Sequence, residues 1–481
     1  MNLLWESDAL LAATAGRPVG AMPEGITGIS IDTRTLQPGD AFFAIKGDRM
    51  DGHDYVTAAM KGGAALAVVA EEKLVALGGI RIPLVVVRDV LEAMRQLASA
   101  ARARSKARII AVTGSVGKTT TKEMMRTVLA ASGSVHASVA SFNNHWGVPL
   151  TLARMPAETR FGVFEIGMNH PDEIRPLVKL VRPHVAVITN VAAAHLGAFD
   201  SIDAIARAKA EIFEGVVAGG YGLVNHDDKR FRLLSDLAAA AGLEHLRTFG
   251  RKRGSDYRLK SVSVEEGASH FEVAIQGKVH RGVLNAPGEH LLSNLLAVLG
   301  AAHLAGADME KSLEACASIR TGKGRGERHV LKHGKARFTL IDESYNANPA
   351  SMRAAIAALG QTEPGARGRR IAVLGDMLEL GKASEKLHRE LAAPIEENNV
   401  QLTLTVGEDI ARLSEVLGKR KSAGHFSSWK EAETKLAEIL RPGDVVMVKA
   451  SNGLRFGELV AALVGKYSGE GKAAGGKGQA G

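Results

Sequence analysis

Residues 109–120 read IIAVTGSVGKTT, and this stretch decides the fold of the chain. Its first five residues are uncharged and rich in β-branched side chains, which is typical of a strand buried in a parallel sheet. A glycine loop follows, and from Lys118 onward the apolar residues of 124–129 recur with helical spacing. Strand, glycine loop and helix in this order predict a phosphate-binding loop at the edge of an α/β sheet.

The residues of this loop suit a nucleoside triphosphate. Backbone N–H groups and the positive end of the helix can hold polyphosphate oxygens, Lys118 adds a point charge, and the Thr119 hydroxyl can ligate magnesium. A usual P-loop has glycine where Val112 stands, so this loop is shorter. The alternative is a chance glycine turn, but the order of the elements favours ATP or GTP. The predicted nucleotide-binding residues are Gly114, Ser115, Val116, Gly117, Lys118, Thr119 and Thr120.

Length and composition indicate a multidomain globular protein. The chain has 481 residues, which at about 150 residues per domain suggests three domains, and 46% of them are hydrophobic. No apolar stretch is long enough for a membrane helix, and Glu6 and Asp8 stand where a secretory signal would carry lysines. The single cysteine, Cys316, fits a reducing compartment. We therefore expect a cytoplasmic protein with no integral membrane segment.

The charge balance is basic, with 61 Lys and Arg against 52 Asp and Glu and a net charge of +9. Such a balance fits either nucleic acid or a small phosphorylated substrate. Basic residues gather at 320–337, but aromatic residues make up only 4% of the chain, so platforms for stacked bases are scarce. The composition therefore favours a small substrate and no nucleic acid.

The pattern of strands and helices predicts an α/β fold with three domains. We expect a small N-terminal α/β domain at 1–106, a central P-loop ATPase-type domain with a parallel sheet at 107–319, a C-terminal Rossmann-like domain at 320–467, and a disordered tail at 468–481. The glycines of 322–326 suit either an interdomain hinge or a plain glycine loop. The expected strands lie at 41–45, 67–69, 84–87, 109–113, 162–166, 185–189, 338–342, 371–375, 402–406 and 445–449.

Two polar residues, Glu165 and His195, lie at or just beyond the carboxyl ends of predicted strands of the central domain. Glu165 ends one strand, and His195 lies a few residues past the next. Because ligands of open α/β sheets bind at the carboxyl ends of the strands, this carboxylate and imidazole could complete a magnesium shell. Each could also be a buried residue that hydrogen-bonds to the backbone. Lys209, taken alone, is most simply a surface charge paired with Glu211 or with a neighbouring residue.

In the order of its phosphate loop, Glu165, His195 and Lys209, the chain resembles the Mur ligases, which are ATP-dependent enzymes that add amino acids to the cytoplasmic peptidoglycan precursor. The resemblance covers roughly residues 25–465, and the short phosphate loop is the form that this family has. Three further stretches carry it, namely 143–152 (NNHWGVPLTL), 288–294 (GEHLLSN) and Gly324-Arg325.

Within the family, the chain resembles the branch that joins D-alanyl-D-alanine to UDP-N-acetylmuramoyl-tripeptide. The resemblance implies an acyl-phosphate intermediate and a pentapeptide product with ADP and phosphate. It rests on residues between Asp32 and His53, and on 192–195 (AAAH), 342–349 (DESYNANP) and 374–381 (LGDMLELG).

The resemblance also implies roles for single residues. Lys118 and Thr119 would hold the triphosphate and a first Mg²⁺ with Glu165, while His195 and a carbamylated Lys209 would hold a second Mg²⁺; the implied catalytic residues are Lys118, His195 and Lys209. Asn294, Arg325 and Asp342 would contact the nucleotide. The implied substrate residues are Asp32, Thr33, Arg34, Phe42, Asp51 and His53 for the uridine diphosphate end, with Asn143, Asn144, Tyr345, Asn346 and Asn348 for the rest of the substrates.

Two other functions stay open at this point. Folylpolyglutamate synthetase resembles the same ligase core but lacks a separate uridine-nucleotide domain before the phosphate loop. A nucleotide-driven switch or nucleic-acid motor would use the same loop for conformational work. We expect a monomer, and the sequence leaves open the third peptide residue (meso-diaminopimelate or L-lysine) and the base for the incoming amine.

Overall fold

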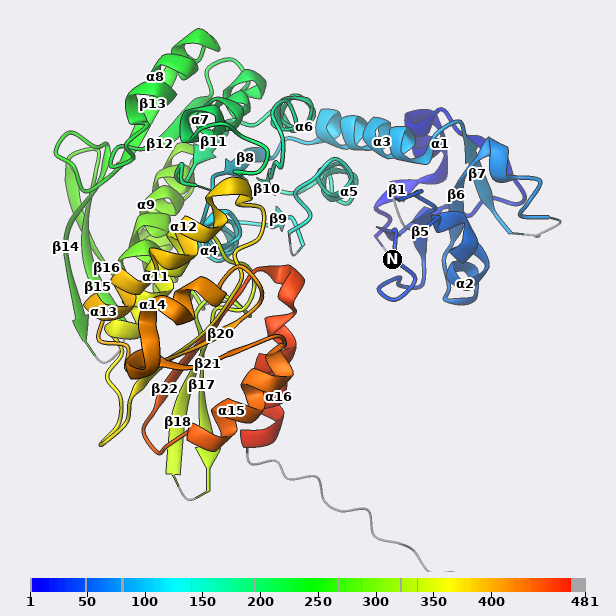
Figure 1. The fold of residues 1–481 in the computed structure, drawn as a ribbon. Helices are drawn as coiled ribbons and strands as arrows, with labels where there is room; N and C mark the ends of the chain where they lie inside the picture. The colour runs from blue at the N-terminus through cyan, green and yellow to red at the C-terminus, as the bar shows by residue number, and fades with distance from the viewer. Residues whose placement is uncertain are drawn as a thin grey trace, which may run out of the picture. The chain divides into compact units, whose positions relative to one another are not determined.

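The computed structural model describes residues 2–47, 50–78, 82–139, 141–193, 196–265, 268–286, 288–320, 322–334 and 336–468 (Figure 1). The chain divides into two compact units. The first comprises Met1–Val191, Asp203–Asn285 and Leu292–Ile319, and the second comprises Ala192–Ile202, Ala286–Leu291 and the chain from Arg320 onward. Except for Ser468, the predicted tail lies outside the described residues. None of the helices in the described ranges is both long and apolar enough to span a bilayer.

The N-terminal part of the first unit is a small α/β module. Its five-stranded sheet has the order β2-β7-β6-β5-β4, and all neighbours are parallel except β2 and β7. A two-stranded sheet, β1 with β3, lies beside it. The elements are β1 (Trp5–Glu6), α1 (Ser7–Thr14), β2 (Arg17–Val19), β3 (Gly25–Ile26), β4 (Gly28–Ser30), β5 (Asp40–Phe43), α2 (Val56–Lys61), β6 (Leu66–Ala70), β7 (Leu84–Val87) and α3 (Val90–Arg104).

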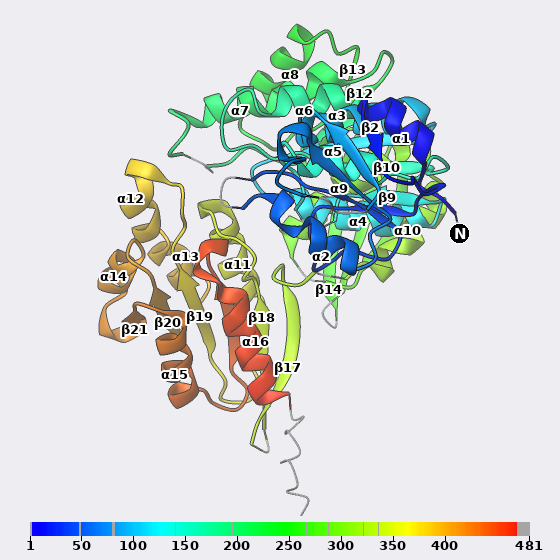
Figure 2. The ribbon, with the colours of Figure 1, turned by 90° about the vertical axis from the view of Figure 1, so that its right-hand side faces the viewer.

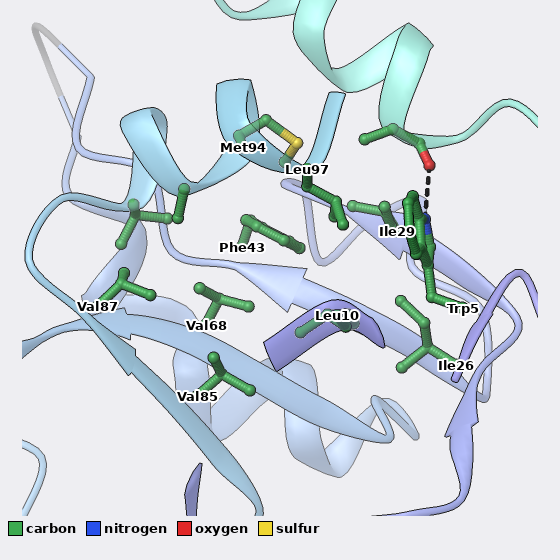
Figure 3. Close-up of a cluster of buried hydrophobic side chains, with 14 of the residues drawn as sticks. Trp5, Leu10, Ile26, Ile29, Phe43, Val68, Val85, Val87, Met94 and Leu97 are labelled. Carbon is green, nitrogen blue, oxygen red and sulfur yellow. Dashed lines mark hydrogen bonds between the residues drawn. The ribbon is translucent and has the colours of Figure 1, made fainter. Parts of the chain in front are cut away.

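The strands of this module are apolar on both faces because both faces are covered. Every residue of β5, β6 and β7 is buried, as expected for the interior of a parallel sheet. Figure 3 shows the cluster on one face, where Phe43 and Val68 of the sheet pack with Leu10, Met94 and Leu97. The three strands predicted in this region are confirmed.

Polar contacts join this module to the central part of the same unit. The Trp5 indole Nε1 donates to the Ala153 carbonyl at 2.9 Å (Figure 3), and the Arg104 guanidinium lies 3.4 Å from the centre of the Trp5 ring. The Arg154 Nε donates to the Ile29 carbonyl at 2.7 Å. The module is therefore held by directional bonds as well as by apolar packing.

The central sheet has nine strands in the order β16-β15-β14-β13-β12-β11-β8-β10-β9. The strands from β9 through β14 are parallel, whereas β15 and β16 are antiparallel additions at one edge. The elements are β8 (Arg108–Thr113), α4 (Lys118–Ala130), β9 (Val135–Ala137), α5 (Gly147–Ala153), β10 (Phe161–Glu165), α6 (Ile174–Val181), β11 (Val185–Ile188), α7 (Ile202–Ala210), β12 (Tyr221–Asn225), α8 (Phe231–Ala240), β13 (His245–Gly250), β14 (Tyr257–Glu265), β15 (Ala268–Ile275), β16 (Lys278–Leu284), α9 (Glu289–Leu304) and α10 (Met309–Ala315).

The three strands that carry the predicted site are neighbours. In the observed register Glu165 lies opposite Val112, and Ile188 lies opposite Thr113. The phosphate loop, Glu165 and the end of β11 therefore meet at one edge, as predicted. The antiparallel edge strands were not predicted, because their alternating polar residues lack the continuous apolar run of the parallel strands.

The second unit contains a six-stranded sheet in the order β17-β18-β22-β19-β20-β21, in which only β17 is antiparallel. Helices α15 and α16 cover one face, and α11, α13 and α14 cover the other (Figure 2). The four strands predicted here are confirmed, and the edge strands β17 and β21 were not predicted. The elements are β17 (Glu327–His333), β18 (Ala336–Asp342), α11 (Pro349–Gly360), β19 (Arg370–Gly375), α12 (Ser384–Arg389), α13 (Ala392–Glu397), β20 (Leu402–Val406), α14 (Ala411–Lys421), β21 (Ser422–Phe426), α15 (Trp429–Ile439), β22 (Val445–Lys449) and α16 (Phe456–Tyr467).

Candidate active site

The phosphate loop lies between β8 and α4 and needs glycine at two positions. Gly114 has a φ of +154° and Gly117 a φ of +85°, a region that side chains with a Cβ rarely adopt. A Cβ on Gly117 would lie 2.5 Å from the Asn294 Oδ1, and one on Gly114 would overlap the Thr189 hydroxyl. The loop is therefore shaped by backbone conformation and by close neighbours, and Asn294 lies beside it.

The first half of the loop is bound to the residues that follow β11. The N–H groups of Ser115 and Val116 donate to the Asn190 carbonyl and to the Asn190 Oδ1, each at 3.0 Å. The Thr189 hydroxyl donates to the Val116 carbonyl at 2.6 Å, and the Thr189 N–H donates to the Thr113 carbonyl at 3.0 Å. Sequence reasoning missed Thr189 and Asn190, although their position directly after the neighbouring strand was a signal.

A hydroxyl and a carboxylate meet at the N-terminal end of α4. The Thr119 Oγ1 donates to the Glu165 Oε2 at 2.7 Å, and the Asn143 Nδ2 donates to the Glu165 Oε1 at 2.8 Å. The Lys118 Nζ donates to the Gly114 carbonyl at 2.8 Å. The structure thus brings Lys118, Thr119, Glu165 and Asn143 together. The Thr119 hydroxyl and the Glu165 carboxylate are oxygen ligands at a helix N-terminus, an arrangement that suits Mg²⁺ beside a polyphosphate.

Asn144, the neighbour of Asn143, has a local structural contact. Its Oδ1 accepts from the Gly147 N–H at 3.0 Å at the beginning of α5. Its predicted substrate role stays a prediction.

Lys209 is buried near the end of α7, with only 2% of its surface exposed. The interpretation as a surface charge is wrong, because the side chain is buried. The two oxygens of Glu211 accept from the Asp172 and Arg175 N–H groups at 2.9 and 3.0 Å. Burial first, and then the positive charge of Lys118, lower the pKa of Lys209 well below its ordinary value. A buried amine with little tendency to protonate is therefore present near the phosphate loop.

His195 lies outside the described residues, and so does Ala194. The surrounding stretch Ala192–Ile202 belongs to the second unit. There the Gly197 N–H donates to the Glu379 carbonyl at 3.0 Å. The role of His195 as a metal ligand stays a prediction.

Three predicted residues meet at the carboxyl end of β18 in the second unit. Asp342 is 1% exposed and accepts from the Gly324 N–H at 2.9 Å and from the Ser344 N–H at 3.0 Å. The Arg325 guanidinium lies 3.9 Å from the centre of the Tyr345 ring. Asp342 thus shapes the glycine turn that presents Arg325 and Tyr345.

The remaining predicted residues of this region have different surroundings. The Asn346 carbonyl accepts from the Lys449 Nζ at 3.0 Å, and Lys449 also lies 3.4 Å from the Glu343 carboxylate. The Asn348 side chain accepts from the Ser351 N–H at 2.9 Å and caps α11. Sequence reasoning missed Lys449, which is almost fully buried at the end of β22.

One further group of possible ligands occurs at this edge of the sheet. One ligand atom from each of Glu327, His329 and Asp342 lies within 4.8 Å of the other two, and this is the one such group in the part of the chain that the structure describes. Both Asp342 oxygens already accept backbone N–H bonds. The Asp342 carboxylate thus uses two of its roughly four acceptor sites to order the turn.

The predicted residues near the start of the N-terminal module differ in exposure. Asp32 forms an exposed ion pair with Arg34 at 2.6 Å, beside Thr33. Phe42 is 1% exposed and packs in the core. The loop of Asp32 to Arg34 is therefore open to a ligand, whereas the side chain of Phe42 serves packing.

Asp51 organises the turn that contains His53. It contacts the His53 Nδ1 at 2.6 Å and the Lys73 Nζ at 2.8 Å, while the His53 Nε2 accepts from the Ala70 N–H at 2.9 Å. Burial raises the pKa of Asp51, but hydrogen bonds from Lys73 and His53 outweigh it and hold that pKa well below the ordinary value. The carboxylate is therefore charged and serves to order this turn.

Comparisons with known proteins agree with this geometry. Models of the Mur ligase family match three consecutive stretches, described as the family's catalytic domain at 25–102, its middle domain at 112–302 and its glutamate ligase domain at 324–452. The UDP-N-acetylmuramoyl-tripeptide–D-alanyl-D-alanine ligase of Bacillus subtilis is 33% identical over 442 residues, which cover 91% of this chain and 93% of that protein.

Two solved structures are similar over almost the whole chain. The crystal structure of MurF from Acinetobacter baumannii has a TM-score of 0.82 at 29% identity and covers 96% of this chain and 99% of its own. MurF from Thermotoga maritima in complex with ADP has a TM-score of 0.74 at 27% identity and covers 91% and 97%. By sequence, by the three matched domains and by fold, this chain belongs to the Mur ligase family.

Proposed function

We propose that this chain is an ATP-dependent ligase that joins D-alanyl-D-alanine to UDP-N-acetylmuramoyl-tripeptide, with UDP-N-acetylmuramoyl-pentapeptide, ADP and phosphate as products. The observation that carries the proposal is the 33% identity, over nine-tenths of both chains, to a protein named for this reaction. The reaction belongs to cytoplasmic peptidoglycan precursor synthesis. The paired Thr119 and Glu165 and the buried Lys209 support the proposal.

The chemical problem is that a carboxylate does not acylate an amine at neutral pH, because its oxygen is a poor leaving group. In the proposed reaction the tripeptide carboxylate attacks the γ-phosphate and displaces ADP. The amine of the dipeptide then attacks the acyl phosphate, loses a proton and displaces phosphate. Negative charge develops on the phosphoryl oxygens and then on a tetrahedral oxyanion, so fixed positive charge stabilises both steps.

The residues at the α4 end fit this task. Lys118 supplies a cation beside the N–H groups of the helix end, and Thr119 with Glu165 would hold a first Mg²⁺. When bound, this ion would neutralise charge on the phosphate oxygens and orient them. The observed contact between the Thr119 hydroxyl and the Glu165 carboxylate supports the fit, because both groups are oxygen ligands.

A second Mg²⁺ would be held by His195 and a carbamylated Lys209. A buried ammonium would repel a cation, whereas a neutral amine can attack carbon dioxide, lose a proton and become an anionic carbamate. The burial of Lys209 and the lowering of its pKa favour the neutral amine that this reaction needs. Lys209 would thus change from a repelled cation into an oxygen ligand.

The other two parts of the chain would bind the rest of the substrates. We assign the uridine diphosphate end to the exposed Asp32–Arg34 loop and the ordered turn around His53 in the N-terminal module. In the second unit, Arg325 and Tyr345 would contact the nucleotide and the peptide. The five-stranded module before the phosphate loop favours this assignment over the folylpolyglutamate alternative.

The proposal is tested by phosphate release in the presence of ATP and Mg²⁺. Release should require both the UDP-linked tripeptide and D-alanyl-D-alanine, and equal release without either would refute the ligase assignment. ¹⁸O in the tripeptide carboxyl group should appear in the released phosphate, since the acyl phosphate transfers that oxygen. Lys209→Ala should lose activity and recover part of it with small carboxylic acids, which replace the missing carbamate.

A further inference from the structure

The loop after β11 fixes the shape of the phosphate loop through hydrogen bonds to its backbone. Asn190 alone accepts from two consecutive N–H groups, those of Ser115 and Val116, through its carbonyl and its Oδ1. Thr189 adds a bond to the carbonyl of Val116 and one to that of Thr113. Within residues 113–116, two backbone N–H groups and two backbone carbonyls are thus hydrogen-bonded to Thr189 and Asn190, which follow β11.

These bonds occupy two N–H groups of the phosphate loop. Those of Ser115 and Val116 donate to Asn190, so in this shape of the loop both are already hydrogen-bonded within the protein. The first intrahelical bond of α4 runs from the Thr121 N–H to the Gly117 carbonyl. The helical hydrogen-bond pattern of α4 therefore begins directly after the loop that Asn190 and Thr189 hold.

We infer that Asn190 and Thr189 are positioning residues of the phosphate loop, which hold its backbone at Thr113, Ser115 and Val116 in the shape that binds the nucleotide. The inference rests on the proposed binding of ATP by this loop. Its physical basis is preorganisation: a loop already held in its binding shape loses less conformational entropy when the ligand arrives. A short loop that lacks the first glycine of a usual P-loop gains this order from the neighbouring strand.

The Gly114 position supports the same arrangement. Its φ of +154° and the close approach of the Thr189 hydroxyl leave no room for a side chain between the loop and β11. The Nδ2 of Asn225, the last residue of β12, contacts the Thr189 carbonyl at 3.5 Å, and Asp228, three residues further on, accepts from the Val191 N–H at 2.6 Å. The positioning residues are therefore themselves held from their other side.

The test measures nucleotide affinity and backbone protection separately in the full-length chain. Asn190→Ala removes the acceptor of the Val116 N–H, so the Val116 amide should exchange with solvent at least tenfold faster. ADP, measured by calorimetry, should bind about tenfold more weakly, which corresponds to about 1.4 kcal/mol. Asn190→Asp keeps the acceptor atom and should retain the wild-type exchange rate at Val116. Asn285→Ala, which loses an exposed bond from its Nδ2 to the Ala317 carbonyl, serves as the matched control and should change neither value.

Three results would overturn the inference. Wild-type ADP affinity and Val116 exchange in Asn190→Ala would remove Asn190 from any positioning role. Weaker ADP binding with unchanged exchange would make Asn190 a direct ligand of the nucleotide. Faster exchange in both Asn190→Ala and Asn190→Asp would mean that the acceptor atom is not what matters. Failure of the wild-type chain to bind ADP would instead refute the proposed function, so the two failures are distinguishable.

Discussion

Gly117→Ala should weaken ATP binding through two separate costs. A residue with a Cβ needs about 1–2 kcal/mol to adopt the left-handed conformation that Gly117 has at a φ of +85°. The new Cβ would also lie 2.5 Å from the Asn294 Oδ1 and 3.1 Å from its Cγ, so Asn294 or the loop must move. We expect a total of about 2–3 kcal/mol, which corresponds to a loss of roughly 30- to 150-fold in affinity.

The assay is calorimetric titration with ATP, together with thermal unfolding. Gly219→Ala is the matched control, because Gly219 has a φ of +68° but a Cβ there would meet nothing within 4 Å. This control should lose about 1 kcal/mol of stability and keep wild-type affinity. An ATP affinity of Gly117→Ala within twofold of wild type would refute the reasoning, since it would mean that the loop binds equally well in another conformation.

Three further predictions concern turnover, pH and stability. Lys118→Ala should abolish turnover while the circular dichroism spectrum stays that of wild type, and wild-type activity would remove the loop from the mechanism. Burial first, and then nearby arginines, lower the pKa of His184 to about 4. As the pH falls, His184 is therefore protonated in the unfolded chain before it is protonated in the folded chain, and the folded chain loses stability. The free energy of unfolding, measured by urea titration, should fall by about 2 kcal/mol between pH 7 and 4, and it should fall less in His184→Gln. Asp444→Asn should lower the free energy of unfolding of the second unit, measured by urea titration, by about 3 kcal/mol, because Asp444 is fully buried and accepts from Arg369 at 2.7 Å. The exposed pair of Lys435 with Glu438 provides the control, and Glu438→Gln should cost less than about 1 kcal/mol.

Much of the site was predictable because it depends on local order along the chain. A buried strand, a glycine turn and a helix start are short-range features, so the amino-acid sequence alone places Lys118, Thr119 and Glu165. The resemblance to the Mur ligases then added Lys209, for which spacing alone favoured a surface charge. Its 2% exposure agrees with the resemblance and not with the local pattern.

The sequence by itself thus determined the phosphate loop, the most apolar of the parallel strands, and Glu165 at the end of one of them, because hydrophobic periodicity and turn chemistry act over a few residues. Only the tertiary structure decided that β11 lies beside β8, so that Asn190 holds the loop. It also decided that Lys209 is buried and that Glu211 accepts backbone N–H bonds near the start of α6. Such contacts join residues tens of positions apart, and they form only when the sheet order brings two strand ends together.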